Sequence, residues 1–168
     1  TEQLIETQLQ SIKAFADSDM ERLVILGAGS LLGYAKEAAL KCLELTNGDL
    51  ISYFETPLGF RHGPKTIIND KTAVLLMSSS DKYSSLYDTD LYNELVNDQQ
   101  CSAVKKLTVD SELVELDDVW QGLYYIVYCQ IFAFFKSISL GLTPDNPCPT
   151  GEVNRVVKGV TIYPLTSR

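Results

Sequence analysis

Apolar and polar positions alternate in blocks along this chain, and the blocks predict helices and strands in turn. Apolar residues recur at helical spacing over 3–17, which predicts an amphipathic helix that packs onto a neighbouring domain or subunit. Short apolar runs bounded by polar or glycine-containing turns predict buried strands. These strands are expected at 22–26, 50–54, 72–77 and within 104–109, with a further short strand at 160–163. Helices are expected at 31–46, 84–98 and 119–140.

The order of these elements predicts the fold class. Strands that alternate with helices form βαβ units, whose parallel strands are covered by helices on both faces. We therefore expect an α/β fold, a three-layer α/β/α sandwich with a mostly parallel sheet of about five strands. The expected organisation is an N-terminal amphipathic helix at 1–20, the α/β domain at 21–140 and a C-terminal tail at 141–168.

Composition and charge narrow the classes of partner. The net charge of −8 argues against nucleic acid, whereas a small phosphate ligand needs only a local patch or a helix N-terminus. The most apolar stretch, 123–135, is too short to span a bilayer, so no membrane association is expected. The spacing of the four cysteines fits neither a zinc ribbon nor a disulfide framework, and His62 is the only histidine. No metal site is expected, and a reducing cytoplasm is the expected compartment.

A glycine-rich turn follows the first predicted strand. In a doubly wound sheet, ligands bind beyond the carboxyl ends of the strands, where Gly27, Gly29 and Ser30 are expected. The glycines let a ligand approach the backbone, and the helix N-terminus attracts an anion. The spacing to Gly33 is one residue longer than the dinucleotide fingerprint. A tight turn that binds nothing fits the pattern equally well.

Three charged residues lie on one face of the following helix. Glu37, Lys41 and Glu44 are spaced i, i+4 and i+7. A lysine between two carboxylates can tune one of them as the base that moves a proton on a sugar carbon. An exposed face with ion pairs is the simpler interpretation, because charged runs usually mark solvated faces. We expect this face to gather with the glycine turn at the ligand edge of the sheet.

His62 lies in the sequence Arg61-His62-Gly63-Pro64, in a polar loop expected after the second strand. A lone histidine is more often structural than catalytic. However, the loop is expected near the ligand edge, and the Gly-Pro pair would fix the imidazole. A neutral histidine can transfer a proton near pH 7, as the opening of a sugar ring requires.

Two further sets of candidate residues give weaker evidence for a functional site. Ser78, Ser79 and Ser80 end the third strand and could donate hydroxyls to a phosphate or cap the next helix. Lys158 is a single amine near the end of the sequence and carries no signal by itself.

Several of these segments together resemble a known family. The runs 26–30, 37–44 and 60–64 resemble the second SIS domain of sugar-phosphate isomerases, such as the isomerase half of glucosamine-6-phosphate synthase. Segments 142–147 and 150–161 resemble the tagatose-6-phosphate ketose/aldose isomerase group, also described as galactosamine-6-phosphate deaminase/isomerase. The resemblance covers roughly residues 20 to 165 and implies a SIS, flavodoxin-like fold.

The resemblance also implies roles for single residues. Glu44 matches the position of the base that moves a proton between C1 and C2 in the synthase relatives. Lys41 and Glu37 match the neighbours of that base on the same helix face. His62 matches a histidine linked to ring opening, which in relatives reaches the site from a neighbouring subunit. Lys158 matches a lysine in a tail that covers the sugar and can form a Schiff base with its carbonyl carbon.

The same resemblance implies the reaction and the assembly. The implied substrate is a hexosamine or hexose 6-phosphate, with galactosamine 6-phosphate deaminated to tagatose 6-phosphate without a metal or redox cofactor. A homo-oligomer, dimeric or larger, and a companion first SIS domain are implied partners. Relatives of the synthase type carry Glu and Lys where this chain has Gly59 and Arg61, and their phosphate loop belongs mainly to the first SIS domain. Arg61 is nevertheless a candidate for substrate binding.

Two other classes of function are compatible with parts of this pattern. A non-catalytic sugar-phosphate-binding SIS domain would keep the glycine turn and the serines without needing Glu44, Lys41 and Lys158 together. A nicotinamide-dependent oxidoreductase is suggested by Glu55, about 20 residues beyond the glycine turn, and disfavoured by the extra residue in that turn.

Overall fold

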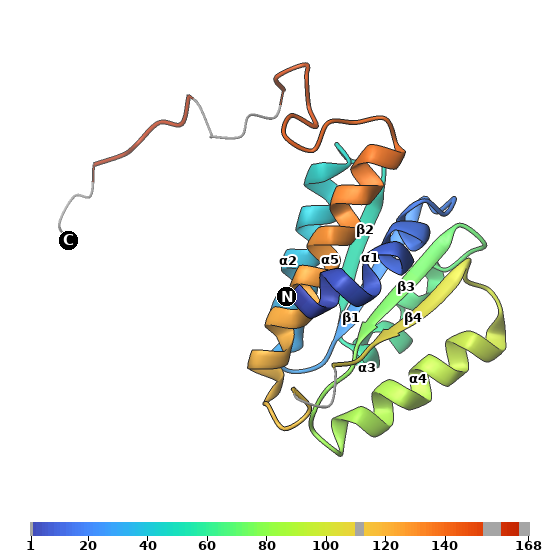
Figure 1. Ribbon diagram of the computed structural model, residues 1–168. Helices are drawn as coiled ribbons and strands as arrows, with labels where there is room; N and C mark the ends of the chain where they lie inside the picture. Colours follow the sequence, from blue (N-terminus) through green and yellow to red (C-terminus); the bar gives the residue numbers. More distant parts are fainter. Residues whose placement is uncertain (1, 110–112, 153–158, 165–168) are drawn as a thin grey trace.

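The fold is a parallel sheet covered by helices on both faces, as seen in a computed structural model that describes residues 2–109, 113–152 and 159–164 (Figure 1). The strands are β1 (Arg22–Gly27), β2 (Ile51–Glu55), β3 (Thr72–Met77) and β4 (Ala103–Leu107). The α-helices are α1 (Glu2–Ala16), α2 (Leu31–Leu45), α3 (Pro57–Arg61), α4 (Ser84–Asp98) and α5 (Asp118–Ser139). A 3-10 helix, η1, spans Pro64–Ile67.

The sheet order is β2-β1-β3-β4, and every neighbouring pair is parallel. Val24 of β1 lies between Tyr53 of β2 and Val74 of β3. The chain leaves β1 for β2 on one side and then returns to β3 on the other. The switch point of this topology therefore lies between the carboxyl ends of β1 and β3, where ligands bind in open α/β sheets.

Two apolar clusters hold the layers together. Leu23, Ile25 and Leu75 belong to the larger cluster, which joins one face of the sheet to α1, α2 and α5. Val24 and Val74 belong to the smaller cluster on the other face, under α3 and α4. Because both faces are covered, β1 and β3 are nearly continuous apolar runs instead of alternating ones. The expected three-layer sandwich is confirmed.

Helices α2 and α5 approach each other closely at a glycine. A methyl group built on Gly122 would lie 2.2 Å from Cε2 of Tyr34, so a larger residue does not fit without movement. The Tyr34 hydroxyl donates a 2.7 Å hydrogen bond to the carbonyl of Val119, one helical turn before Gly122. This contact fixes the position of α2 on the domain.

Two sequence-based expectations are wrong. The described residues form four strands, not about five, because the segment expected as a strand at 160–163 has no strand partner and Ile162 is 90% exposed. The polar loop expected after β2 contains α3 and η1. Thr56 caps α3 by accepting a hydrogen bond from the Gly59 N–H, and Pro57 occupies the first turn, where its missing N–H costs nothing.

The other expected helices and strands are found within two residues of their predicted bounds, and those at 72–77 and 84–98 coincide with β3 and α4. Within the described segments, no helix combines the length and the apolar character needed to cross a membrane.

Candidate functional site

Three of the charged residues of α2, Glu37, Lys41 and Glu44, form a connected group at the surface of the helix. The ammonium of Lys41 donates a 2.7 Å hydrogen bond to Oε2 of Glu44 and lies 3.6 Å from Oε1 of Glu37. The hydrogen bond from Lys41 to Glu44 is the main cause of a raised Lys41 pKa, so this ammonium stays charged at neutral pH. The side chains of Glu37 and Glu44 are nearly half exposed. The face can therefore receive a ligand or a protein partner.

This face does not gather with the glycine turn. Helix α2 starts at the carboxyl edge of the sheet and runs antiparallel to the strands, so Glu44 lies in its last turn. The thirteen residue-to-residue steps from Leu31 to Glu44 correspond to about 20 Å at 1.5 Å per residue. The expectation that both features meet at one edge is wrong for a single copy of this chain, because the helix length separates them.

Two leucines accompany these charges on the surface of α2. Leu40 and Leu43 are 43% and 42% exposed, although α2 buries other apolar side chains against the sheet and α5. The exposed residues Glu37, Leu40, Leu43 and Glu44, together with the partly exposed Lys41, are here called the α2 surface. Its mixture of an ion-paired carboxylate and apolar side chains is typical of a surface that is partly covered in an assembly.

The glycine turn is tightly closed on itself. A methyl group on Gly27 would lie 2.6 Å from the carbonyl oxygen of Leu31, and Gly29 has a φ of +53°. The N–H groups of Leu31, Leu32 and Gly33 donate to the carbonyls of residues 28–30. These contacts explain the glycines without a ligand, and Ser30 is exposed at the start of α2.

The serine-rich loop after β3 is bound to a carboxylate of the same chain. Oδ2 of Asp118 accepts a 2.7 Å hydrogen bond from the Ser79 hydroxyl. Its Oδ1 accepts from the Ser80 hydroxyl at 2.8 Å and from the Ser80 N–H at 2.5 Å. The Ser78 carbonyl accepts from the Tyr125 hydroxyl at 2.9 Å. The hydroxyls of Ser79 and Ser80 are thus engaged, which favours a structural role over phosphate binding.

A second carboxylate lies beside the same loop. Asp88 of α4 is buried and accepts a 2.9 Å hydrogen bond from the Ser79 N–H through Oδ2, while its Oδ1 has no partner. Burial is the main cause of a raised Asp88 pKa, and the charge of Asp118 adds to it. Two acidic groups at this edge disfavour an incoming anion. Sequence reasoning missed both, although Asp118 occupies the first turn of a helix, where acidic residues are favoured.

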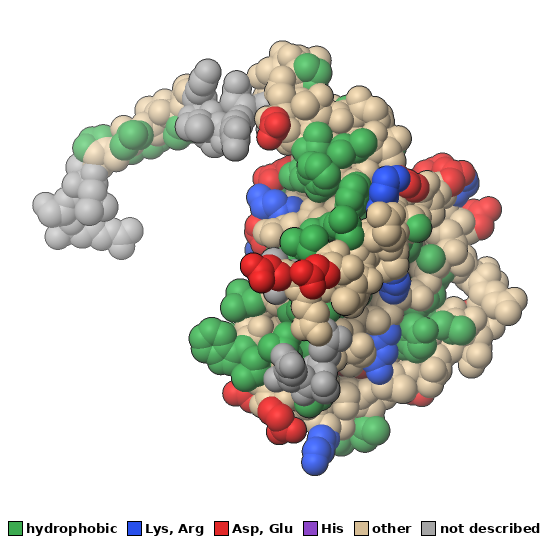
Figure 2. Space-filling view, viewed as in Figure 1, with side chains coloured by type: hydrophobic (Ala, Val, Ile, Leu, Met, Phe, Trp, Pro, Cys, Tyr) green, Lys and Arg blue, Asp and Glu red, His purple; other side chains and the backbone are tan. Residues whose placement is uncertain are grey.

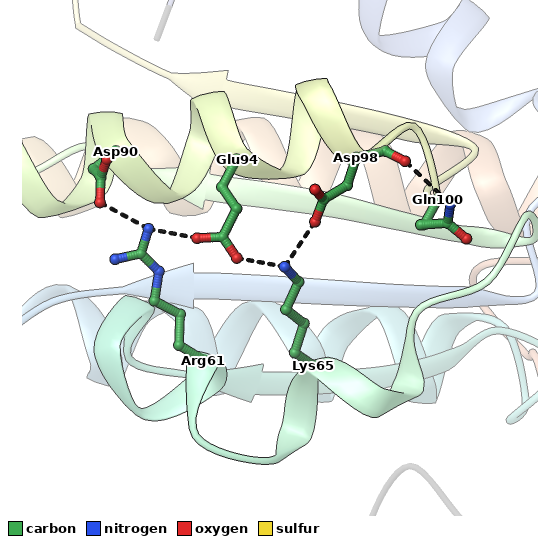
Figure 3. A network of polar contacts seen from close by, with 6 residues as sticks. All are labelled: Arg61, Lys65, Asp90, Glu94, Asp98 and Gln100. Atoms are coloured by element: carbon green, nitrogen blue, oxygen red, sulfur yellow. Dashed lines mark hydrogen bonds and ion pairs between the residues drawn. The ribbon is translucent and has the colours of Figure 1, made fainter.

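His62 is exposed directly after α3, and its backbone N–H donates a 3.1 Å hydrogen bond to the Gly59 carbonyl. Arg61, the residue before it, donates to Asp90 at 2.8 Å and to Glu94 at 2.6 Å (Figure 3). Arg61 was expected to bind substrate. In this structure its guanidinium is held by the two carboxylates of α4.

The sheet lies between His62 and Glu44. Helix α2 packs on one face through Ala38 and Cys42, and α3 packs on the other face through Phe60. One copy of the chain therefore does not bring the two candidate side chains to a common pocket. A hollow elsewhere contains none of the predicted site residues. It is lined by Lys65, Ile68, Leu95, Asp98, Gln100 and Cys101.

Lys158 lies outside the described residues. Within the described part of the chain, no group of three or more His, Cys, Asp or Glu side chains is arranged to hold a metal ion.

Comparison with known proteins decides the family. No family model matches the chain. It is 50% identical over 168 residues to D-galactosamine-6-phosphate deaminase AgaS of Shewanella sp. (strain ANA-3), covering 98% of this chain and 43% of that protein. It superimposes with a TM-score of 0.82 on tagatose-6-phosphate ketose/aldose isomerase from Escherichia coli, at 35% identity, covering 98% of this chain and 46% of that one. The chain belongs to the SIS-domain sugar-phosphate isomerase family.

A further relative in this SIS-domain family is D-galactosamine-6-phosphate deaminase AgaS of Escherichia coli, 40% identical over 163 residues, covering 89% of this chain and 42% of that protein. The chain thus spans less than half the length of the curated relatives it matches.

Proposed function

We propose that this SIS domain supplies the acid–base residues of a galactosamine-6-phosphate deaminase that forms tagatose 6-phosphate. The observation that carries the proposal is the exposed group on α2, in which the charged Lys41 holds the carboxylate of Glu44 by a 2.7 Å hydrogen bond. A carboxylate held in this way has the chemistry of a general base. The names of the 50% and 40% identical relatives support the choice of substrate.

The reaction begins with a closed sugar ring. The hydroxyl on C1 loses its proton, the bond between C1 and the ring oxygen breaks, and the ring oxygen gains a proton. His62 is the proposed carrier of this proton, because its side chain is exposed and a positioned imidazole can act as a general acid or base. The product of this step is the open-chain aldehyde.

Glu44 then takes the proton from C2 and returns it to C1. At the same time O1 gains a proton and the amino nitrogen loses one, so the amino aldehyde becomes an imine at C2 with an alcohol at C1. Water adds to the imine carbon and ammonia leaves, so that galactosamine 6-phosphate and water give tagatose 6-phosphate and ammonia. Lys41 orients Glu44, and Glu37 supports the charge of Lys41. Lys158 is the proposed amine that closes over the sugar from the tail.

The complete pocket is proposed to form between copies of the chain. Because the sheet lies between Glu44 and His62, a histidine from a neighbouring subunit is needed to complete the site around Glu44. A homo-oligomer with a two-fold axis can exchange this histidine reciprocally.

The phosphate group is proposed to bind mainly in a companion SIS domain. In this chain, Asp118 already accepts the hydrogen bonds of the Ser79 and Ser80 hydroxyls. The chain covers 43% of the Shewanella relative, which leaves room for a second domain of similar size. The glycine turn is closed on itself by its own backbone contacts. We therefore propose that it makes at most a peripheral contact to the substrate, through Gly27, Gly29 and Ser30.

A surface for the companion domain lies on the side of α2 and α5. Figure 2 shows hydrophobic side chains at the surface on this side of the molecule. Several large exposed apolar side chains on one side of a domain fit an interface with another domain. The large apolar side chains that α2 and α5 expose are Leu40, Leu43, Val119, Trp120, Leu123, Phe134 and Ile138.

The free cysteines fit a reducing compartment, and a cytoplasmic location is part of the proposal.

The test is ammonia release from galactosamine 6-phosphate by the full-length enzyme. Glu44→Gln is expected to lower kcat by about 10²–10⁴-fold, the usual contribution of a general base, while substrate binding is preserved. Glu6→Gln, which removes an exposed carboxylate on α1, is the matched control and should leave kcat unchanged. Equal activity of the two variants would remove Glu44 from the mechanism. Substrate binding without turnover in the wild type would favour a regulatory domain.

A further inference from the structure

Glu94 binds the two cations that flank His62 in the sequence. Its Oε2 accepts a 2.6 Å hydrogen bond from Arg61, one residue before His62. Its Oε1 accepts one from the ammonium of Lys65, three residues after His62. Figure 3 shows the carboxylate between the two basic side chains. One group on α4 thus ties together the end of α3 and the start of η1.

Two other acidic residues of α4 hold one cation each. Asp90 accepts a 2.8 Å hydrogen bond from Arg61, and Asp98 accepts a 2.8 Å hydrogen bond from Lys65. With Glu94 they form a row spaced i, i+4 and i+8, which lies on one helical face. Glu94 is therefore the member of this row that links the two cations to each other.

The network stays charged at neutral pH. The hydrogen bond to Asp90 is the main cause of a raised Arg61 pKa, and that to Asp98 is the main cause of a raised Lys65 pKa. The hydrogen bond from Lys65 is the main cause of a lowered Glu94 pKa. The side chains of Arg61, Lys65 and Glu94 are a quarter to a third exposed. Solvent therefore weakens the pairs, and their contribution to global stability is small.

The segment between the two cations carries the candidate histidine on its surface. His62 is exposed, and its neighbouring turn is closed by local backbone hydrogen bonds from His62 to Gly59 and from Thr66 to Gly63. These local bonds shape the turn without setting its position relative to α4. The apolar packing of Phe60 against α4 and the ion pairs of Asp90 and Asp98 contribute to that position. Among the ion pairs of the described residues, Glu94 alone connects both ends of the turn to each other and to α4.

We propose that Glu94 is a positioning residue for His62, fixing the turn from which the imidazole reaches the sugar ring. The proposal rests on the ring-opening role of His62 in the proposed function. It assigns to an acidic side chain of α4 a role in catalysis that requires no contact with substrate. A displacement of about 1 Å at a reacting group can lower a rate by about 10²-fold, so a small release of the turn is enough to be measured.

The experiment compares two substrates of the full-length enzyme. One is galactosamine 6-phosphate, and the other is an analogue that lacks the C5 hydroxyl and cannot form the six-membered ring. Glu94→Gln is expected to lower kcat/KM for the cyclic substrate by about 10-fold and to leave the analogue within about twofold of wild type. Asp90→Asn is the matched control, because it removes one cation's partner and leaves the bridge through Glu94 intact. It should lower neither value by more than about twofold.

His62→Ala separates this inference from the function on which it rests. If His62→Ala slows the cyclic substrate selectively, the ring-opening role holds, and Glu94→Gln in that background should cause no further loss. A Glu94→Gln enzyme that keeps full activity on both substrates, or loses activity equally on both, overturns the positioning role. If His62→Ala has no selective effect, the ring-opening role itself is wrong, whatever Glu94→Gln does.

Discussion

The ammonium of Lys41 donates a 2.7 Å hydrogen bond to the carboxylate of Glu44, three residues further along α2. The pair lies on an exposed helical face, so its contribution to folding is small. Its effect is on geometry, because the bond restricts the rotamers from which Glu44 can reach a neighbouring group.

Replacing Lys41 by Met should therefore affect catalysis more than stability. We expect kcat to fall by about 10- to 100-fold, since Glu44 loses the hydrogen bond that orients it, while the thermal unfolding midpoint changes little. Lys13→Met is the control, because it removes a similar exposed ion pair, with Asp17, on α1. Steady-state kinetics and thermal unfolding of both full-length variants give the comparison. A Lys13→Met variant as inactive as Lys41→Met would contradict a specific role for Lys41.

The contact between α2 and α5 predicts a steric effect at Gly122. Gly122→Ala places a methyl group against the Tyr34 ring and should destabilise the protein by about 1–3 kcal/mol, the usual cost of overpacking. Because α2 carries Glu44, kcat should fall as well. Gly33→Ala, in the same helix with open space around its Cα, should instead stabilise by about 0.5–1 kcal/mol. Chemical denaturation measures both changes, and an unaltered Gly122→Ala protein would show that the helices can move apart freely.

The serine loop provides a prediction about phosphate binding. Ser80→Ala removes the 2.8 Å hydrogen bond to Asp118 and should lower stability by about 1 kcal/mol, because one hydrogen bond to a charged group is lost. KM for galactosamine 6-phosphate should stay within about twofold of wild type if the loop is structural. A large rise in KM with unchanged stability would return Ser80 to the phosphate site.

Buried Asp88 predicts a pH dependence of stability. Burial raises its pKa in the folded protein, so the folded state binds the proton more tightly than the unfolded state does. The contribution of Asp88 to stability is greatest when it is protonated in both states, falls as the pH rises above the ordinary aspartate value of about 3.9, and levels off above the folded pKa. Asp88→Asn, whose amide oxygen can still accept from Ser79, should gain stability relative to wild type over this range. A stability difference that is independent of pH would rule out this titration.

Much of the fold could be predicted from the sequence. The apolar run at 72–77 and the helix at 84–98 were located at their observed bounds, because long periodic patterns and buried runs carry strong signals. Helix α3 was missed because five residues are too few to show a period. The pair Thr56-Pro57 was nevertheless a readable start signal. At 160–163, alternating apolar residues suggested a strand, but a strand also needs a neighbour, which the sequence pattern does not reveal.

The candidate site could be predicted only in part. Spacing placed Glu37, Lys41 and Glu44 on one face, and the structure confirms that they form one ion-paired group. Their distance from the glycine turn follows from the length of the helix and could have been calculated. The hydrogen-bond partners of Arg61 and Ser79 could not be predicted. Glu94 lies 33 residues after Arg61, and Asp118 lies 39 residues after Ser79. Such long-range pairs depend on how the layers pack.

Subunit complementation tests the central claim most directly. Full-length Glu44→Gln and His62→Ala subunits are each expected to be inactive or severely impaired as homo-oligomers on galactosamine 6-phosphate. When the two are co-expressed and mixed at random as dimers, one site of each hybrid combines an intact Glu44 with an intact His62 from its partner. Ammonia release should then recover to about a quarter of wild type, since half of the dimers are hybrids and each has one complete site of two. A mixture no more active than the average of the two parent variants would contradict a site shared between subunits.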